Sequence, residues 1–107
     1  MDQAQIRNVL KEYGESLRRE YGEELSQVIL YGSRSRLDAH EGSDIDVLCV
    51  MRDRFDYGEM IDRSSEVTSR LSLKYDVVLS RTFVTHQDYV LSKLPFVVNV
   101  RREGIRI

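Results

Sequence analysis

The sequence predicts an α/β fold of the α+β kind, in which a small mixed β-sheet is flanked by helices. Stretches with helical periodicity alternate along the chain with short apolar runs that are rich in β-branched residues. One long, charged helical stretch separates two of these runs, a spacing that suits a crossover between parallel strands. The chain has 107 residues, 41% of them hydrophobic, which is enough for one core without disulfides or a structural metal. We therefore expect a single domain over residues 1–107.

The first two elements come from periodicity and β-propensity. Apolar residues recur three or four positions apart near the N-terminus, which predicts a helix over residues 2–21 that stops near Gly22. The β-rich run 27–31 predicts a strand that ends at Gly32 and Ser33.

The middle of the chain predicts a loop, two strands and the helix between them. Residues 34–43 are polar and predict a loop with room for one helical turn. The nearly all-apolar run 45–51 predicts a central strand that is covered on both faces. Helical spacing predicts a helix over residues 55–73, and residues 75–80 predict a third strand.

The C-terminal part predicts two short helices and a final strand. Residues 85–94 favour a helix that is capped by its first residue, a threonine. Residues 96–103 have β-propensity, but Pro95 before them and Gly104 after them favour a helix. Residues 105–107 would begin a short last strand.

Charge and cysteine content exclude several classes of protein. Sixteen basic residues against eighteen acidic ones give a net charge of -2, so we expect no direct binding to nucleic acid. Cys49 is the single cysteine, which excludes a disulfide framework and a zinc cluster, and its apolar run predicts a buried, inert thiol. The polar N-terminus has no signal core and no run approaches a membrane span, so we expect a cytoplasmic protein without membrane contact.

One motif predicts a site that binds a metal ion and phosphate. It consists of Gly32 and Ser33, then ten residues, then Asp44, Ile45 and Asp46. Residues two apart on a strand point to the same side, so Asp44 and Asp46 present two carboxylates from one face. Such a pair repels unless a cation lies between them, and Mg²⁺ takes carboxylate and phosphate oxygens. Gly32 lets a phosphate approach the backbone, and Ser33 offers an N–H and a hydroxyl to the same oxygens.

This motif also constrains the sheet. If Gly32 at the end of one strand meets Asp44 at the start of the next, these two strands run antiparallel. A crossover helix would make the second and third strands parallel and bring their starts to one edge. Asp76 would then join Asp44 and Asp46, and three carboxylates could hold two Mg²⁺ ions for in-line displacement at phosphorus.

The run GSRSRLDAHEGSDIDVLCV resembles the minimal nucleotidyltransferases, small members of the DNA polymerase β-like superfamily, and the resemblance covers essentially the whole chain. It implies a nucleotidyltransferase fold in which Gly32 and Ser33 bind nucleotide phosphates. It also implies that Asp44, Asp46 and Asp76 are the catalytic, metal-binding acids.

The chain departs from the family pattern Gly-Ser-x-Ala-Arg-Gly, because Ser35 and Leu37 stand at the Ala and final Gly positions. The loss of the final Gly stiffens the loop that carries Arg34 and Arg36, and it therefore bears on the contacts of these two arginines with the nucleotide. Both arginines lie between the phosphate and metal elements, where they would neutralise triphosphate charge or remain solvated.

The resemblance implies Mg²⁺-dependent transfer of AMP from ATP to a hydroxyl. Small stand-alone members are commonly antitoxins that add AMP to a tyrosine of a HEPN-domain RNase toxin, so a HEPN toxin is the implied partner in a hetero-oligomer. The chain has no room for a domain that grips the acceptor, which agrees with a protein partner. Two alternatives remain: a binding module that neutralises its partner by occlusion, and nucleotidyl transfer to a small molecule.

Aromatic and histidine residues allow weaker inferences. His40 and His86 lack metal-ligand spacing, so we expect them at the surface. Tyr31, Tyr57 and Tyr75 are expected in or near the core, with stacking of one of them on the adenine ring as an alternative.

Overall fold

The computed structural model describes residues 3–32 and 44–107. Helices and strands follow one another along the chain in the order α1 (Gln3–Tyr21), η1 (Gly22–Glu24), β1 (Leu25–Tyr31), β2 (Ile45–Met51), α2 (Tyr57–Tyr75), β3 (Leu79–Thr85), α3 (His86–Leu91), α4 (Pro95–Glu103) and β4 (Ile105–Arg106).

The four strands form one mixed sheet in the order β3-β2-β1-β4. Strand β2 is antiparallel to β1 and parallel to β3, as the sequence predicts. The two-residue strand β4 adds to the free side of β1 in antiparallel orientation. The C-terminal end of β1 and the N-terminal ends of β2 and β3 therefore share one edge of the sheet.

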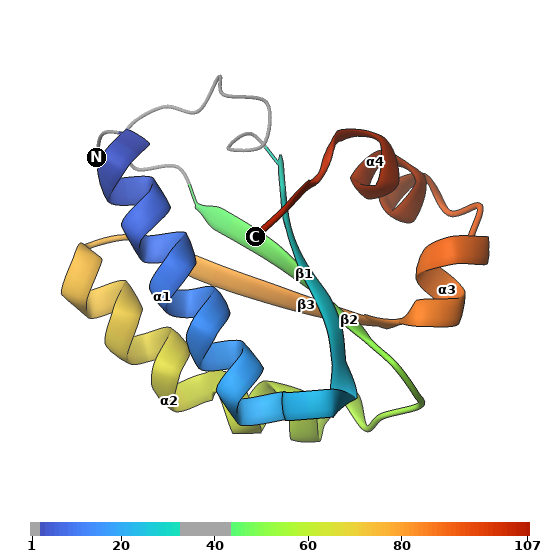
Figure 1. Ribbon diagram of the computed structural model, residues 1–107, viewed down its shortest axis with the longest axis horizontal. Coiled ribbons are helices and arrows are strands. Elements are labelled where there is room, and N and C mark those ends of the chain that lie inside the picture. The colour runs from blue at the N-terminus through green and yellow to red at the C-terminus, as the bar shows by residue number, and fades with distance from the viewer. Residues whose placement is uncertain (1–2, 33–43) are drawn as a thin grey trace.

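Helices cover both faces of this sheet (Figure 1), with α1 and α2 together on one side and α3 and α4 on the other. Strand β2 alternates between the two layers. Val47 and Cys49 belong to the larger core cluster with α1 and α2, whereas Leu48 and Val50 pack in a second cluster with Val100 of α4. This double burial explains why the run is almost entirely apolar.

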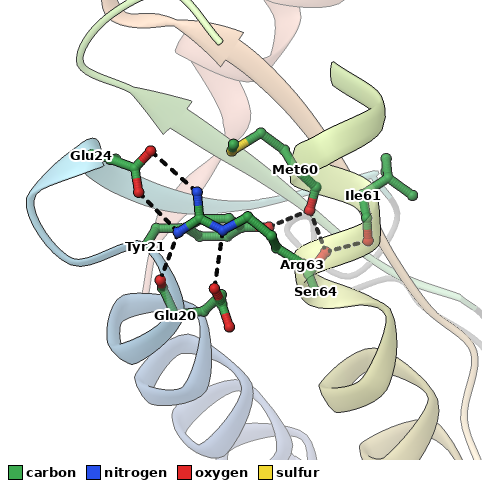
Figure 2. A network of polar contacts seen from close by, with 7 residues as sticks. All are labelled: Glu20, Tyr21, Glu24, Met60, Ile61, Arg63 and Ser64. Atoms are coloured by element: carbon green, nitrogen blue, oxygen red, sulfur yellow. Dashed lines mark hydrogen bonds and ion pairs between the residues drawn. The ribbon is translucent and has the colours of Figure 1, made fainter. Parts of the chain in front are cut away.

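Arg63 of α2 ties that helix to the C-terminal end of α1 (Figure 2). Its Nε lies 3.0 Å from Oε2 of Glu20, and its two terminal nitrogens donate to the Glu24 carboxylate at 3.2 and 2.9 Å. The guanidinium also lies 5.0 Å above the ring of Tyr21, whose hydroxyl donates to the Met60 carbonyl. These contacts fix the point from which β1 starts.

The third strand lies later in the chain than residues 75–80, so that prediction is wrong in position. Helix α2 continues to Tyr75, and Asp76 then adopts the left-handed conformation with φ 52°. The N–H of Val77 donates to the Ser72 carbonyl at 3.1 Å, which completes a Schellman cap. The chain needs the residues after this turn to reach the sheet, so β3 begins at Leu79.

Both C-terminal helices are present as predicted, although the first is shorter. Thr85 caps α3 by accepting a hydrogen bond from the Asp88 N–H at 3.1 Å. The helix ends at Leu91 because Leu94, which precedes Pro95, is extended and serves as the N-cap of α4.

Cys49 is buried, and burial raises the pKa of its thiol to about 12, in agreement with an inert core cysteine. Across residues 3–32 and 44–107, no helix has both the length and the apolar content that a membrane crossing requires.

Gly104 joins α4 to β4 where space is tightest. A β-carbon at this position would lie 2.5 Å from Cγ2 of Ile29 and 2.6 Å from the Val100 carbonyl oxygen. Because one of these atoms is backbone, Gly104→Ala is expected to lower the free energy of unfolding by about 2 kcal/mol in urea titrations.

Gly58→Ala is the matched control, because a β-carbon at Gly58 would meet only Oδ1 of Asp56, at 3.5 Å. Gly58 lies in the first turn of α2, where alanine is the better helix former, so we expect unchanged or slightly higher stability. Equal stabilities of the two variants would contradict the steric argument at Gly104.

Candidate active site

Three residues lie side by side at the shared edge of the sheet. Tyr31 pairs with Asp46 across the antiparallel β1–β2 ladder, and Asp46 pairs with Ser80 across the parallel β2–β3 ladder. Residues paired in this way project from the same face of a sheet. That face is the one that carries Leu48, Val50 and, further along, α4.

Gly32 follows β1 and lies against the Asp46 carboxylate. Its φ is +82°, and a β-carbon there would lie 3.1 Å from Oδ2 of Asp46. The positive φ therefore favours glycine, and a β-carbon here would also press on the Asp46 carboxylate. The sequence predicts that Gly32 meets Asp44, whereas the structure places Gly32 against Asp46, two residues further along.

Asp44 and Asp46 form a carboxylate pair without a described counter-charge. Asp44 is exposed and Asp46 is half-buried; burial and, second, the charge of Asp44 raise the pKa of Asp46. Within residues 3–32 and 44–107, no hydrogen bond or ion pair reaches either carboxylate. Two neighbouring carboxylates to which the described residues bring no positive charge fit a hard cation such as Mg²⁺.

The Tyr31 ring lies across β2 beside this pair. Its hydroxyl shares a 3.2 Å hydrogen bond with Oγ1 of Thr82 on β3, so the side chain spans from β1 over β2 to β3. Burial and the nearby Asp46 charge raise the pKa of Tyr31. From α4, the ring of Phe96 meets Tyr31 edge to face, with centroids 5.2 Å apart.

The structure does not bring Asp76 to the carboxylate pair. Among the described residues, no three His, Cys, Asp or Glu side chains gather as a metal site would need. Asp76 instead closes the cap of α2, next to Tyr75, whose hydroxyl donates to Glu12 of α1 at 2.8 Å. A catalytic role for Asp76 stays a prediction.

Ser80 occupies the position on β3 that lies beside Asp46, and sequence reasoning missed it. The signal was the β-branched and aromatic content of residues 82–85, which places the strand later than the apolar run 77–79 does. Ser33, Arg34 and Arg36, together with His40, lie outside the described residues, so their nucleotide-binding or surface roles stay predictions.

The chain matches the model of the nucleotidyltransferase domain family over residues 10–103. It is 36% identical over 97 residues to a Methanocaldococcus jannaschii protein named as a candidate protein adenylyltransferase, a match that covers 89% of this chain and 90% of that protein. A second such protein from the same organism is 34% identical over 76 residues, covering 71% of this chain and 76% of its own length.

Two solved structures share the fold. A crystal structure of a toxin–antitoxin with AMP-PNP superposes with a TM-score of 0.59 at 21% identity, covering 90% of this chain and 70% of the other. A mutant of the toxin–antitoxin MntA-HpeT gives a TM-score of 0.55 at 20% identity, covering 86% and 66%.

Asp46→Asn is expected to stabilise the protein at neutral pH. Because folding raises the pKa of Asp46, the folded state binds this proton more readily, and the carboxylate costs stability once the pH exceeds its pKa. Differential scanning calorimetry at pH 7 should show Tm higher by about 2 to 4 °C, with the difference vanishing towards pH 3.

Mg²⁺ tests the same pair. It should raise the Tm of the wild-type protein and leave that of Asp46→Asn unchanged, because only the former keeps both oxygen donors. The control is Asp53→Asn, an exposed aspartate beyond the opposite end of β2, which should respond to Mg²⁺ like the wild type. A full Mg²⁺ response in Asp46→Asn would argue against the cation site.

The variant Asp76→Gly distinguishes the structural role of Asp76 in capping α2 from its predicted role as a metal ligand. Glycine adopts φ 52° without strain, so we expect the free energy of unfolding to stay the same or rise by about 1 kcal/mol. The Mg²⁺-induced rise in Tm should persist, since Asp76 lies apart from the pair. Its loss in both Asp76→Gly and the isosteric Asp76→Asn, with the fold intact, would instead support Asp76 as a ligand.

Proposed function

The chain belongs to the nucleotidyltransferase domain family, and on that basis we propose that it transfers AMP from ATP to a tyrosine hydroxyl of a partner HEPN toxin and so acts as an antitoxin. The protein is a nucleotidyltransferase; the nucleotide, the acceptor and the partner are the proposed part. One observation carries the proposal: the Asp44–Asp46 pair, without a described counter-charge, lies against a glycine at the edge of the sheet.

Asp44 and Asp46 would hold Mg²⁺. When bound, this ion would neutralise triphosphate charge and polarise the α-phosphate. In the two-ion arrangement that the sequence suggests, Asp44 and Asp46 would hold both ions, and Asp76 would be a further ligand of the ion that activates the incoming hydroxyl.

The residues of the chain prepare the displacement. Gly32, which has no β-carbon, lets the chain pass close to the Asp46 carboxylate, and Ser33 would donate hydrogen bonds to phosphate oxygens held there by the ion. In the reaction, the acceptor oxygen bonds to the α-phosphorus as the bond to the β-phosphate breaks. Pyrophosphate would leave with that electron pair, and the proton of the acceptor hydroxyl would pass to a water molecule.

Two comparisons support a protein acceptor. Relatives that are more than 30% identical are named as candidate protein adenylyltransferases. A structure with the same fold is a toxin–antitoxin with AMP-PNP, which agrees with a nucleotide and a toxin as ligands.

We expect α-labelled ATP with Mg²⁺ to label a co-expressed HEPN toxin, or a protein band in host extract. Asp44→Asn and Asp46→Asn should each lower labelling by about a hundredfold or more, because metal-assisted charge neutralisation contributes several kcal/mol. The measurement is label per acceptor after electrophoresis, followed by mass spectrometry of the modified residue.

Asp53→Asn serves as the control and should label at the wild-type rate, since it lies at the other end of β2. Neutralisation of the toxin by Asp46→Asn, without label, would instead favour occlusion. Label on small hydroxyl compounds but not on protein would favour a small-molecule acceptor.

A further inference from the structure

Tyr31 and Phe96 form an aromatic corner beside the carboxylate pair. Tyr31 lies directly across the ladder from Asp46, and Phe96 contacts the Tyr31 ring with an interplanar angle of 86°. Tyr31 is therefore the direct neighbour of Asp46 on the next strand, and Phe96 is the direct neighbour of Tyr31.

The rings of Tyr31 and Phe96 differ in how firmly they are held and in how much of each is exposed to solvent. Tyr31 is held at both ends, by its strand and by its hydrogen bond to Thr82, and it is half-buried. Phe96 stands in the first turn of α4 and remains 41% exposed although it packs on Tyr31. Tyr31 therefore acts as a fixed support, and Phe96 offers the accessible aromatic surface.

The other two tyrosines that the sequence suggests for stacking, Tyr57 and Tyr75, pack on other parts of the fold. Tyr57 is 46% exposed and also makes an edge-to-face pair, with Phe83 at 5.6 Å. Phe83, however, pairs with Cys49 and belongs to the core cluster on the α1–α2 face. Tyr75 donates its hydroxyl to Glu12 between those helices. Neither residue shares the face that carries Asp46.

We propose that Phe96, supported edge to face by Tyr31, is the surface on which the purine base of the nucleoside triphosphate stacks. This inference rests on the proposed function, because it assumes that the triphosphate lies at Gly32 and the Asp44–Asp46 pair. Stacking on an aromatic side chain accepts any base by its π-face and favours the larger purines. The corner would thus bind the nucleoside end, and the pair would bind the phosphate end.

Isothermal titration calorimetry with Mg·ATP and with Mg·tripolyphosphate distinguishes binding of the nucleoside end from binding of the phosphate end. Phe96→Leu keeps an apolar side chain but removes the ring, and it should raise the Kd for Mg·ATP about tenfold. The Kd for Mg·tripolyphosphate, which has no base, should not change. Phe96→Trp keeps an aromatic surface and should bind Mg·ATP at least as tightly as the wild type.

Tyr57→Leu is the matched control, since it removes an equally exposed ring from a similar edge-to-face pair on the opposite face. It should leave both Kd values unchanged. Thermal unfolding of each variant confirms that the fold is kept.

Three outcomes would count against the proposal in distinguishable ways. Wild-type affinity of Phe96→Leu for Mg·ATP, while Asp46→Asn weakens both probes, would overturn stacking and leave the proposed function standing. Unchanged nucleotide affinity with a higher KM for the protein acceptor would assign Phe96 to partner docking instead. Failure of the wild type to bind either probe would overturn the proposed function itself.

Discussion

The close approach of the Asp46 carboxylate to Gly32 is the constraint around which the rest of the molecule is arranged. The carboxylate oxygen lies 3.1 Å from the place where a β-carbon of residue 32 would stand, so a larger residue there would press on it and would also have to adopt a positive φ. The contact exists because β1 and β2 are antiparallel and pair Tyr31 with Asp46. Burial of β2 on both faces holds that register, since a slip of one residue would turn each apolar side chain to the wrong layer.

Stability and chemistry oppose each other at this edge. Asp44 and Asp46 receive no hydrogen bond or ion pair from the described residues, and the pKa of Asp46 is raised as a result of burial and repulsion. The fold tolerates this because stability comes from elsewhere, above all the two core clusters and the Arg63 contacts that join α1 to α2. A pair of acids with this repulsion would gain stability from a cation placed between them.

Most elements follow from local pattern, whereas the details of the site depend on tertiary structure. Helical periodicity predicts α1 and α2, and the all-apolar run predicts β2 with its double burial. Residues 77–79 look like a strand, but the left-handed turn at Asp76 shifts β3, and sequence pattern does not reveal that an aspartate takes this glycine-like conformation. The contact between Tyr31 and Phe96 could not be predicted either, because it arises only when α4 packs on the sheet.

The position of Asp46 between Tyr31 and Ser80 also bears on the order in which the protein forms. The contact of Gly32 with Asp46 closes a short segment of chain, whereas the meeting of Tyr31 with Phe96 needs nearly the whole polypeptide. Contacts between residues near in sequence form with less loss of chain entropy. The acidic edge therefore depends on β1 and β2 alone, whereas the aromatic corner also requires α4 to pack on the sheet.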